Sequence, residues 1–296
     1  MKARFLFPYK LRYLGYLLAI PGLILGYLSF NEGYEFPWLT LHLSKKWFVF
    51  SEMENFTNEL ALTFIIAGLL LIAFSRQKHE DELTGKIRLN ALYWAILINY
   101  GAFPILCLLV ILSGFIPVDS FTKGLRSFAF LLTLTIYNLF IPLIIFIVRF
   151  YYLLYRRRNE FTVKPVRYLP NKPFRAIGKW SSFFFLTVMI AGKFFKDLES
   201  ASQTLLLISP YSLLLWAYSK EKIEDEFIGM IRLEAMQVAV YANYVILLLA
   251  NFLIYGFDFL DVTGINMFAT PLIFIIWFQY RLFRLNRQTS FKSVLL

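Results

Sequence analysis

Eight long apolar segments, joined by polar loops, constrain the fold of this chain more than any other feature. A hydrocarbon layer about 30 Å thick needs roughly 20 apolar residues of helix to cross it. The chain is 59% hydrophobic and contains 33 phenylalanines, which agrees with a bilayer as its solvent. We therefore expect an all-α integral membrane protein. The segments run over residues 13–30, 60–74, 89–118, 127–148, 180–195, 200–219, 235–257 and 262–280.

The basic residues of the loops indicate the orientation of the chain. With the N-terminus in the cytosol, 24 of the 30 Lys and Arg residues fall on the cytosolic side and 6 on the outer side. The same assignment places the C-terminus in the cytosol, as an even number of spans requires. Topology and anionic lipid headgroups therefore account for the net charge of +11. We expect the lipid bilayer, and no nucleic acid, as the partner of this charge.

An internal repeat divides the chain into two units. The stretch "SRQKHEDELTGKIRLNALYWAILINY", from Ser75, matches "SKEKIEDEFIGMIRLEAMQVAVYANY", from Ser219, at 13 of 26 positions. Flanking apolar residues also match, with Pro142 opposite Pro271 and "LRYLG" opposite "FRAIG". Because each copy holds four spans, both enter from the same side, as parallel repeats do. We expect about eight transmembrane helices in two parallel four-helix repeats, 1–158 and 180–296, joined by a cytosolic linker, 159–179.

Three consecutive acidic residues are the most polar part of each copy. The helical pattern over 76–87 predicts that the next span starts before the acids. Lys78 then lies four residues before Glu82, and Lys222 has the same place in the second copy, so each pair would close on a helix surface. The acids form either this structural elbow, a site for Ca²⁺, Mg²⁺ or a permeating cation, or a docking surface for a cytosolic protein. They are Glu80, Asp81, Glu82, Glu224, Asp225 and Glu226.

Each copy also carries an arginine and an asparagine at matching positions. Arg88 and Arg232 are expected to pair with the acids, to hold lipid phosphate or to anchor the inner face of the protein. Asn99 and Asn243 follow the arginines by 11 residues, which is about 16 Å along a helix. They therefore lie near the bilayer centre. A buried amide there either joins neighbouring helices or lines a pore or substrate cavity.

The sequence contains no motif for catalysis or cofactor binding. G-x-S-x-G, H-E-x-x-H and P-loop patterns are all absent from it. The single cysteine, Cys107, lies in an apolar segment, which excludes an intrachain disulfide. His42 and His79 are expected on opposite sides of the membrane, so they cannot form one haem or zinc site. We expect a protein without enzymatic activity and without a cofactor.

The motif K-x-E-D-E-x-x-x-x-I-R-L-x-A, at the inner end of a span, resembles one found in uncharacterised bacterial multi-spanning proteins built from four-helix units. The resemblance covers the two repeated loops and the spans after them, about a fifth of the chain. It implies a multi-pass protein of the bacterial inner membrane. It carries over no site residue.

Two functions remain open at the level of the sequence. The internal repeat, the paired asparagines and the absence of a sizeable soluble domain favour a transporter or channel for a small solute or ion. The cytosolic position of the acids favours a membrane sensor or regulatory subunit that docks a cytosolic partner. The lack of a charged residue deep in the membrane agrees with this alternative, because coupled pumps usually need one. A second copy of the chain is a further partner that the sequence leaves open.

Overall fold

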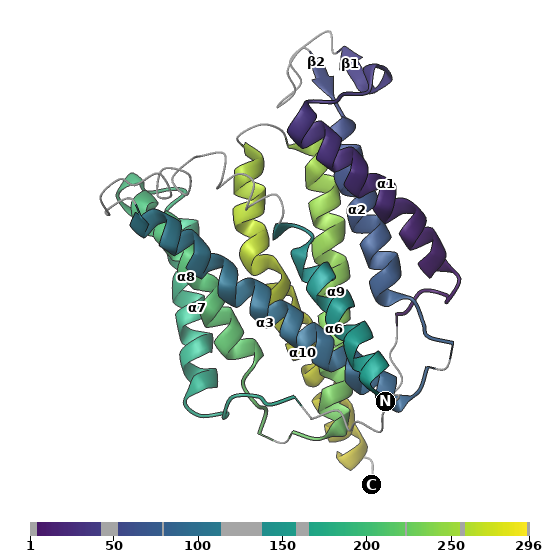
Figure 1. The fold of residues 1–296 in the computed structure, drawn as a ribbon. Helices are drawn as coiled ribbons and strands as arrows, with labels where there is room; N and C mark the ends of the chain where they lie inside the picture. Colours follow the sequence, from purple (N-terminus) through teal and green to yellow (C-terminus); the bar gives the residue numbers. More distant parts are fainter. Residues whose placement is uncertain are drawn as a thin grey trace.

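The protein is a bundle of long helices, which confirms the all-α class (Figure 1). A computed structural model describes residues 5–42, 53–78, 80–113, 138–157, 166–222, 224–254 and 258–294. The helices are α1 (Leu11–Glu32), α2 (Thr57–Phe74), α3 (Glu82–Ser113), α6 (Ile141–Arg157), α7 (Phe174–Ala191), α8 (Glu199–Ala217), α9 (Glu226–Leu253) and α10 (Asp258–Val294). Smaller elements are the 3₁₀ turns η1 (Pro37–Leu39) and η2 (Lys196–Leu198) and the antiparallel strands β1 (Thr40–His42) and β2 (Met53–Asn55).

Among the described residues, four helices, α1, α2, α7 and α9, are long and apolar enough to cross a membrane. Only 22% of the apolar stretch of α1 and 11% of that of α7 is buried inside the protein. The rest includes large apolar side chains such as Trp180, which is 71% exposed, and Phe184, which is 61% exposed. A continuous apolar surface of this kind is stable only against lipid or another apolar partner. The chain is therefore a membrane protein.

Small residues bring α1 against α2 and α7 against α8. A Cβ atom on Gly68 of α2 would lie 2.5 Å from the backbone nitrogen of Ala19 in α1. A Cβ atom on Gly178 of α7 would lie 2.5 Å from the backbone nitrogen of Trp216 in α8. Glycine at such a position lets two backbones approach closely, which is how helices associate in lipid. The result is two helical hairpins, α1/α2 and α7/α8.

Each hairpin packs against a helix from the other half of the chain. Helix α3 contacts α8 and helix α9 contacts α2, while α3 and α9 also contact each other. In Figure 1, α3 crosses the front of the molecule toward α8, and α2 lies beside α9. The Tyr211 hydroxyl of α8 donates to the Gly101 carbonyl of α3 at 2.9 Å. Asn251 of α9 donates to the Glu59 carbonyl of α2 at 3.1 Å.

Several helix boundaries differ from the expected spans. Helix α2 begins three residues before the expected span 60–74, and α7 begins six residues before 180–195. The expected linker 159–179 is therefore too long, because its last six residues already belong to α7. These residues, which start at Phe174, were missed because the polar side chains among them hide the helical pattern. The first half of the expected span 127–148 lies outside the described residues, which resume at Asn138.

Candidate functional site

The loops that connect α2 to α3 and α8 to α9 are extended, and we call residues 75–81 the first elbow and 219–225 the second elbow. Ser75 pairs in parallel with Phe7, and Ser219 pairs in parallel with Leu169. Each pairing contains two backbone hydrogen bonds of 2.9 Å. The prediction of a helix over 76–87 is therefore wrong for its first residues. Backbone groups that the helix would have paired internally are paired instead with a segment distant in the sequence.

An aspartate ends each elbow and begins the next helix. The Asp81 carboxylate accepts the backbone N–H of Thr84 at 2.8 Å, and the Asp225 carboxylate accepts that of Ile228 at 2.8 Å. Aspartate is among the preferred residues for this N-terminal capping role. The middle acid of each triad is therefore a helix cap. It fixes the start of α3 at Glu82 and of α9 at Glu226.

The first acid of the first elbow holds a buried arginine. Arg88 Nε lies 3.0 Å from Glu80 Oε1, and Arg88 Nη2 lies 3.2 Å from Glu80 Oε2. The same guanidinium donates to the carbonyl of Ala73 at 3.0 Å and to that of Ser75 at 2.8 Å. Arg88 therefore ties the start of α3 to the end of α2 through a two-pronged ion pair, the strong form of the arginine–carboxylate contact.

The second elbow repeats this arrangement atom for atom. Arg232 contacts Glu224 at 2.9 and 3.1 Å and donates to the carbonyls of Ala217 at 2.9 Å and Ser219 at 2.8 Å. The Arg88 and Arg232 side chains are 0% and 1% exposed. Neither arginine reaches a lipid phosphate or anchors the surface, so those two expectations are wrong. The expected pairing with the acids is what occurs.

Aromatic rings cover both guanidinium groups. Arg88 lies 4.5 Å from the centre of the Phe150 ring, and Arg232 lies 4.7 Å from that of Phe278. Tyr168 precedes Leu169, which pairs with the second elbow, and its ring centre lies 4.3 Å from Arg232. Burial raises the pKa of the Tyr168 hydroxyl far above its usual range, although Arg232 lowers it. Tyr168 therefore stays neutral, and its ring stabilises the arginine through a cation–π contact.

The aromatic rings also correct the register of the repeat. Phe150 and Phe278 correspond at an offset of 128 residues, whereas Pro142 and Pro271, matched in the sequence, differ by 129. The neighbouring pair Phe146 and Phe274 follows the same offset, because each ring stacks on the ring four residues later. By contact, Pro142 therefore corresponds to Thr270. The prolines were a weaker guide than the arginine contacts.

The third acid of each triad brings the starts of α3 and α9 together. Lys86 Nζ lies 2.9 Å from Glu226 Oε1 and 3.9 Å from Glu82 Oε1. The two carboxylates are therefore closer than one Debye length, about 10 Å at 0.1 M salt. The expected helix-surface pair of Lys78 with Glu82 is wrong, since α3 begins after Lys78, whose ammonium lies 6.0 Å from the centre of the Tyr9 ring. Lys222 also precedes its helix.

The six acids fall into three kinds of structural environment. Two hold buried arginines, two cap helices, and two lie exposed beside Lys86. In the part of the chain that the structure describes, no group of three or more His, Cys, Asp or Glu side chains is placed to hold a metal ion.

The buried asparagines lie deeper in the bundle. Asn243 of α9 donates to Asn266 Oδ1 of α10 at 2.7 Å, so it joins two helices. Asn99 of α3 is 5% exposed. Cys107 lies farther along α3, and His79 falls outside the described residues.

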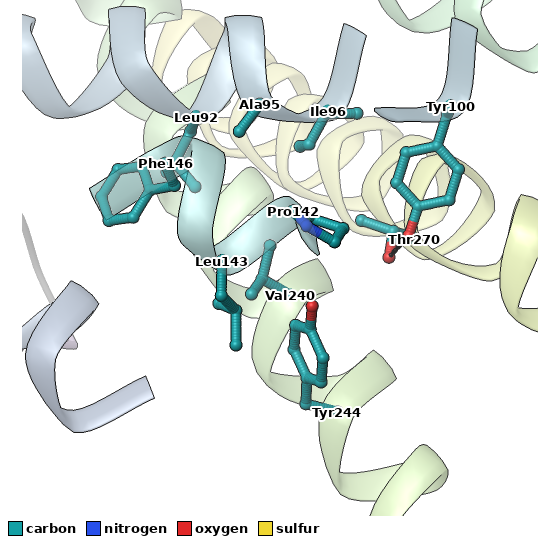
Figure 2. Close-up of a pocket in the computed structure, with 10 residues that line it drawn as sticks. All are labelled: Leu92, Ala95, Ile96, Tyr100, Pro142, Leu143, Phe146, Val240, Tyr244 and Thr270. Carbon is teal, nitrogen blue, oxygen red and sulfur yellow. Dashed lines mark hydrogen bonds between the residues drawn. The ribbon is translucent and has the colours of Figure 1, made fainter. Parts of the chain in front are cut away.

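A small cavity lies where α3, α6, α9 and α10 meet (Figure 2). Its volume of about 10 Å³ is close to the minimum that holds one water molecule. Tyr100 donates a 2.7 Å hydrogen bond to Thr270 Oγ1, and the hydroxyl of Tyr244 points into the same region. Most of the remaining lining is aliphatic, including Ile96 and Val240. Tyr100 and Tyr244 carried a signal in the sequence, because both are identical positions of the repeat beside the asparagines.

No family model, curated protein or solved structure matches this chain.

Proposed function

We propose that the chain is a transporter or channel for a small solute, built from two parallel four-helix repeats. The first repeat contains α1, α2, α3 and α6, and the second contains α7 to α10. The identical contacts of Arg88 and Arg232 support this division. In this proposal eight helices span a bacterial inner membrane, with both termini and both elbows on the cytosolic side. The excess of Lys and Arg in these loops supports the orientation.

The transport proposal rests on one observation: residues at equivalent positions of the two repeats line the cavity together. Tyr100 and Tyr244 hold the same position in the two copies of the repeat, and both line the cavity. Two further matched pairs, Ile96 with Val240 and Pro142 with Thr270, line it as well. The cavity is therefore shared by the two halves. Substrate sites of transporters with internal repeats lie at such a position, near the bilayer midplane.

The lining of the cavity favours an uncharged solute. Its polar groups are the hydroxyls of Tyr100, Tyr244 and Thr270, and no ionised side chain is among its lining residues. A cation would lose its hydration there without gaining a carboxylate, which is unfavourable in a medium of low polarity. Because the cavity has room for about one water molecule, passage of a solute requires the two halves to move apart.

A thiol reagent tests whether the cavity opens. In a Cys107→Ser background, Thr270→Cys is expected to react with a small water-soluble methanethiosulfonate in the folded protein, because a transport cycle exposes the cavity to water. Adding Ile96→Trp fills the cavity and is expected to slow the reaction at least tenfold. The same Trp variant is expected to reduce glycerol permeation into proteoliposomes, followed by light scattering. A Thr270→Cys thiol that reacts only after unfolding contradicts the proposal.

The alternative, a sensor or regulatory subunit, is favoured by the surface that the starts of α3 and α9 form. Glu82 and Glu226 side chains are 56% and 74% exposed beside Lys86. Phe227, the next residue of α9, is 48% exposed, and Met230 is 37% exposed. Charged and apolar side chains on one surface are typical of a protein-docking site.

Charge reversal tests this alternative. Glu82→Lys with Glu226→Lys is expected to abolish stoichiometric co-purification of a cytosolic protein from native membranes, because the charge complementarity is lost. Lys193→Glu, beyond the far end of α7, serves as the matched control and is expected to leave co-purification unchanged. A set of co-purifying proteins that is the same in all three samples contradicts a docking role for the elbows.

A further inference from the structure

The two halves differ at the place where the first helix of each half meets its elbow. We call this place the first corner where α1 meets the first elbow, and the second corner where α7 meets the second elbow. In the second half, the guanidinium of Arg175, in the first turn of α7, forms an ion pair with Glu221. Arg12, in the first turn of α1, is its counterpart, because each arginine lies three residues before a closely packed glycine, Gly15 or Gly178. Both corners therefore carry a cation. Among the described residues, only those of the second half place a carboxylate on this cation.

In the first half, glutamine replaces this carboxylate. Gln77 occupies the position that corresponds to Glu221. Arg12 instead donates to the backbone carbonyl of Arg76 at 3.1 Å, and its guanidinium carbon lies 5.3 Å from the ring centre of Tyr9 and 5.5 Å from that of Tyr151. A carbonyl and two ring faces do not neutralise a full positive charge. The first corner therefore keeps a net positive charge.

One buried donor at this corner has no acceptor. Arg12 Nε is buried without a hydrogen-bond partner among the described residues, whereas the Tyr151 hydroxyl interacts with the side chains of Gln77 and Tyr16. Buried polar groups in native proteins are almost always paired, so an unpaired guanidinium nitrogen requires an explanation. The Glu80 carboxylate, which accepts the backbone N–H of Gln77, does not supply one, because Arg88 occupies both of its oxygens.

The corner opens beside the lipid-facing side of α1. Tyr13 and Leu17, on the first turns of this helix, are 61% and 68% exposed. Lys78 and Arg76 lie exposed at the same corner, with Lys78 beside the Tyr9 ring. Counted from the equivalent paired residues Phe7 and Leu169, Asn171 of the second corner stands in the place of Tyr9, and its side chain donates to the Lys220 carbonyl. The aromatic rings are thus specific to the first corner, and aromatic side chains are enriched at membrane surfaces.

We propose that Arg12, Gln77 and Lys78 bind the phosphate group of an anionic lipid headgroup, with Tyr9 and Tyr151 as the aromatic wall of the site. A phosphate oxygen accepts from the guanidinium and the amide, as Glu221 accepts from Arg175 in the other half. Arginine suits phosphate because of its planar set of donors. The lipid supplies the negative charge that the first corner lacks.

Two reciprocal substitutions test the site in the full-length protein. Gln77→Glu gives the first corner the carboxylate of the second, and Glu221→Gln removes it from the second corner. Bound lipids are counted by native mass spectrometry with phosphatidylglycerol, and with phosphatidylcholine as the uncharged-headgroup control. Gln77→Glu is expected to bind phosphatidylglycerol at least about fivefold more weakly than wild type, the factor that corresponds to about 1 kcal/mol. Glu221→Gln is expected to gain one bound anionic lipid.

The outcomes separate a lipid from a soluble anion. Inorganic phosphate, compared with chloride at equal ionic strength, is expected to leave the melting temperature of the wild type unchanged. If inorganic phosphate raises that temperature in the wild type but not in Gln77→Glu, and phosphatidylglycerol has no effect, the ligand is a soluble phosphate and the lipid assignment fails. If Gln77→Glu folds and binds phosphatidylglycerol as tightly as wild type, the corner is not an anion site.

Discussion

The acidic residues of each triad contribute differently to the free energy of unfolding. Glu80 compensates the charge of Arg88, which is 0% exposed, whereas the Glu82 side chain is 56% exposed. Removing one partner of a buried pair leaves a charge uncompensated and costs about 3–5 kcal/mol, whereas an exposed pair contributes less than about 1 kcal/mol. Glu80→Gln is therefore expected to lower the free energy of unfolding by about 3 kcal/mol, and Glu82→Gln by less than about 1 kcal/mol. Reversible unfolding in mixed micelles measures both.

The second elbow provides the matched control. Glu224→Gln is expected to cause the same loss as Glu80→Gln, because Arg232 makes the same four contacts as Arg88. Equal effects of Glu80→Gln and Glu82→Gln would falsify the assignment of different roles to these two acids.

Within the helical hairpins, the glycines decide how closely the paired elements approach. At Gly68 a Cβ atom would lie 2.5 Å from the Ala19 backbone nitrogen, which cannot move without shifting α1. Overpacking of this kind costs about 1–3 kcal/mol. Gly68→Ala is therefore expected to lower the melting temperature of the protein, measured in detergent by intrinsic fluorescence. Gly178→Ala is expected to do the same through α7 and α8.

Gly26, a glycine of α1, serves as the control for this prediction. A Cβ atom on Gly26 would make an ordinary contact, 3.6 Å from Ile65 Cδ1. Gly26→Ala is expected to be neutral or stabilising, since alanine favours a helix by about 1 kcal/mol over glycine. A Gly26→Ala loss as large as that of Gly68→Ala would mean that helix flexibility, rather than close packing, explains the glycines.

At the scale of the whole molecule, an ion pair between the starts of two helices helps to hold the two halves together. Lys86 and Glu226 join the starts of α3 and α9 at 2.9 Å. A Lys86→Cys, Glu226→Cys variant without Cys107 is expected to cross-link with a short bifunctional thiol reagent, because the two side chains are in contact. A protease site inserted between residues 159 and 165 separates the two halves after cleavage, so that the cross-link can be detected on a denaturing gel. The cross-linked halves are expected to remain one band after cleavage.

A pair of cysteines at opposite ends of the bundle controls for random cross-linking. Lys86 lies near the start of α3, and Lys193 lies just after the end of α7. In Figure 1 the start of α3 and the end of α7 lie at opposite ends of the molecule. Lys86→Cys with Lys193→Cys is expected to separate into two bands after cleavage. Two bands from the Lys86–Glu226 pair would instead show that the elbows do not meet.

The sequence by itself determined the features that depend on local chemistry. Apolar length predicted the positions of the helices, and the repeated motif identified Arg88 and Arg232 as matched residues. It also indicated that an asparagine of the repeat lies buried in the bundle, where Asn243 joins α9 to α10. These features depend on composition and short spacings, which the order of residues contains directly.

Only the tertiary structure decided which acid does what. The helical pattern continues through 76–87, yet Phe7, far away in the sequence, pairs with Ser75 and keeps the elbow extended. Glu80 can then turn back to Arg88, eight residues later, which no helix-surface spacing predicts. The structure also decided that Arg175 meets a carboxylate, Glu221, whereas Arg12 meets a backbone carbonyl. Contacts between distant segments are not encoded in local periodicity, because they depend on how the assembled helices meet.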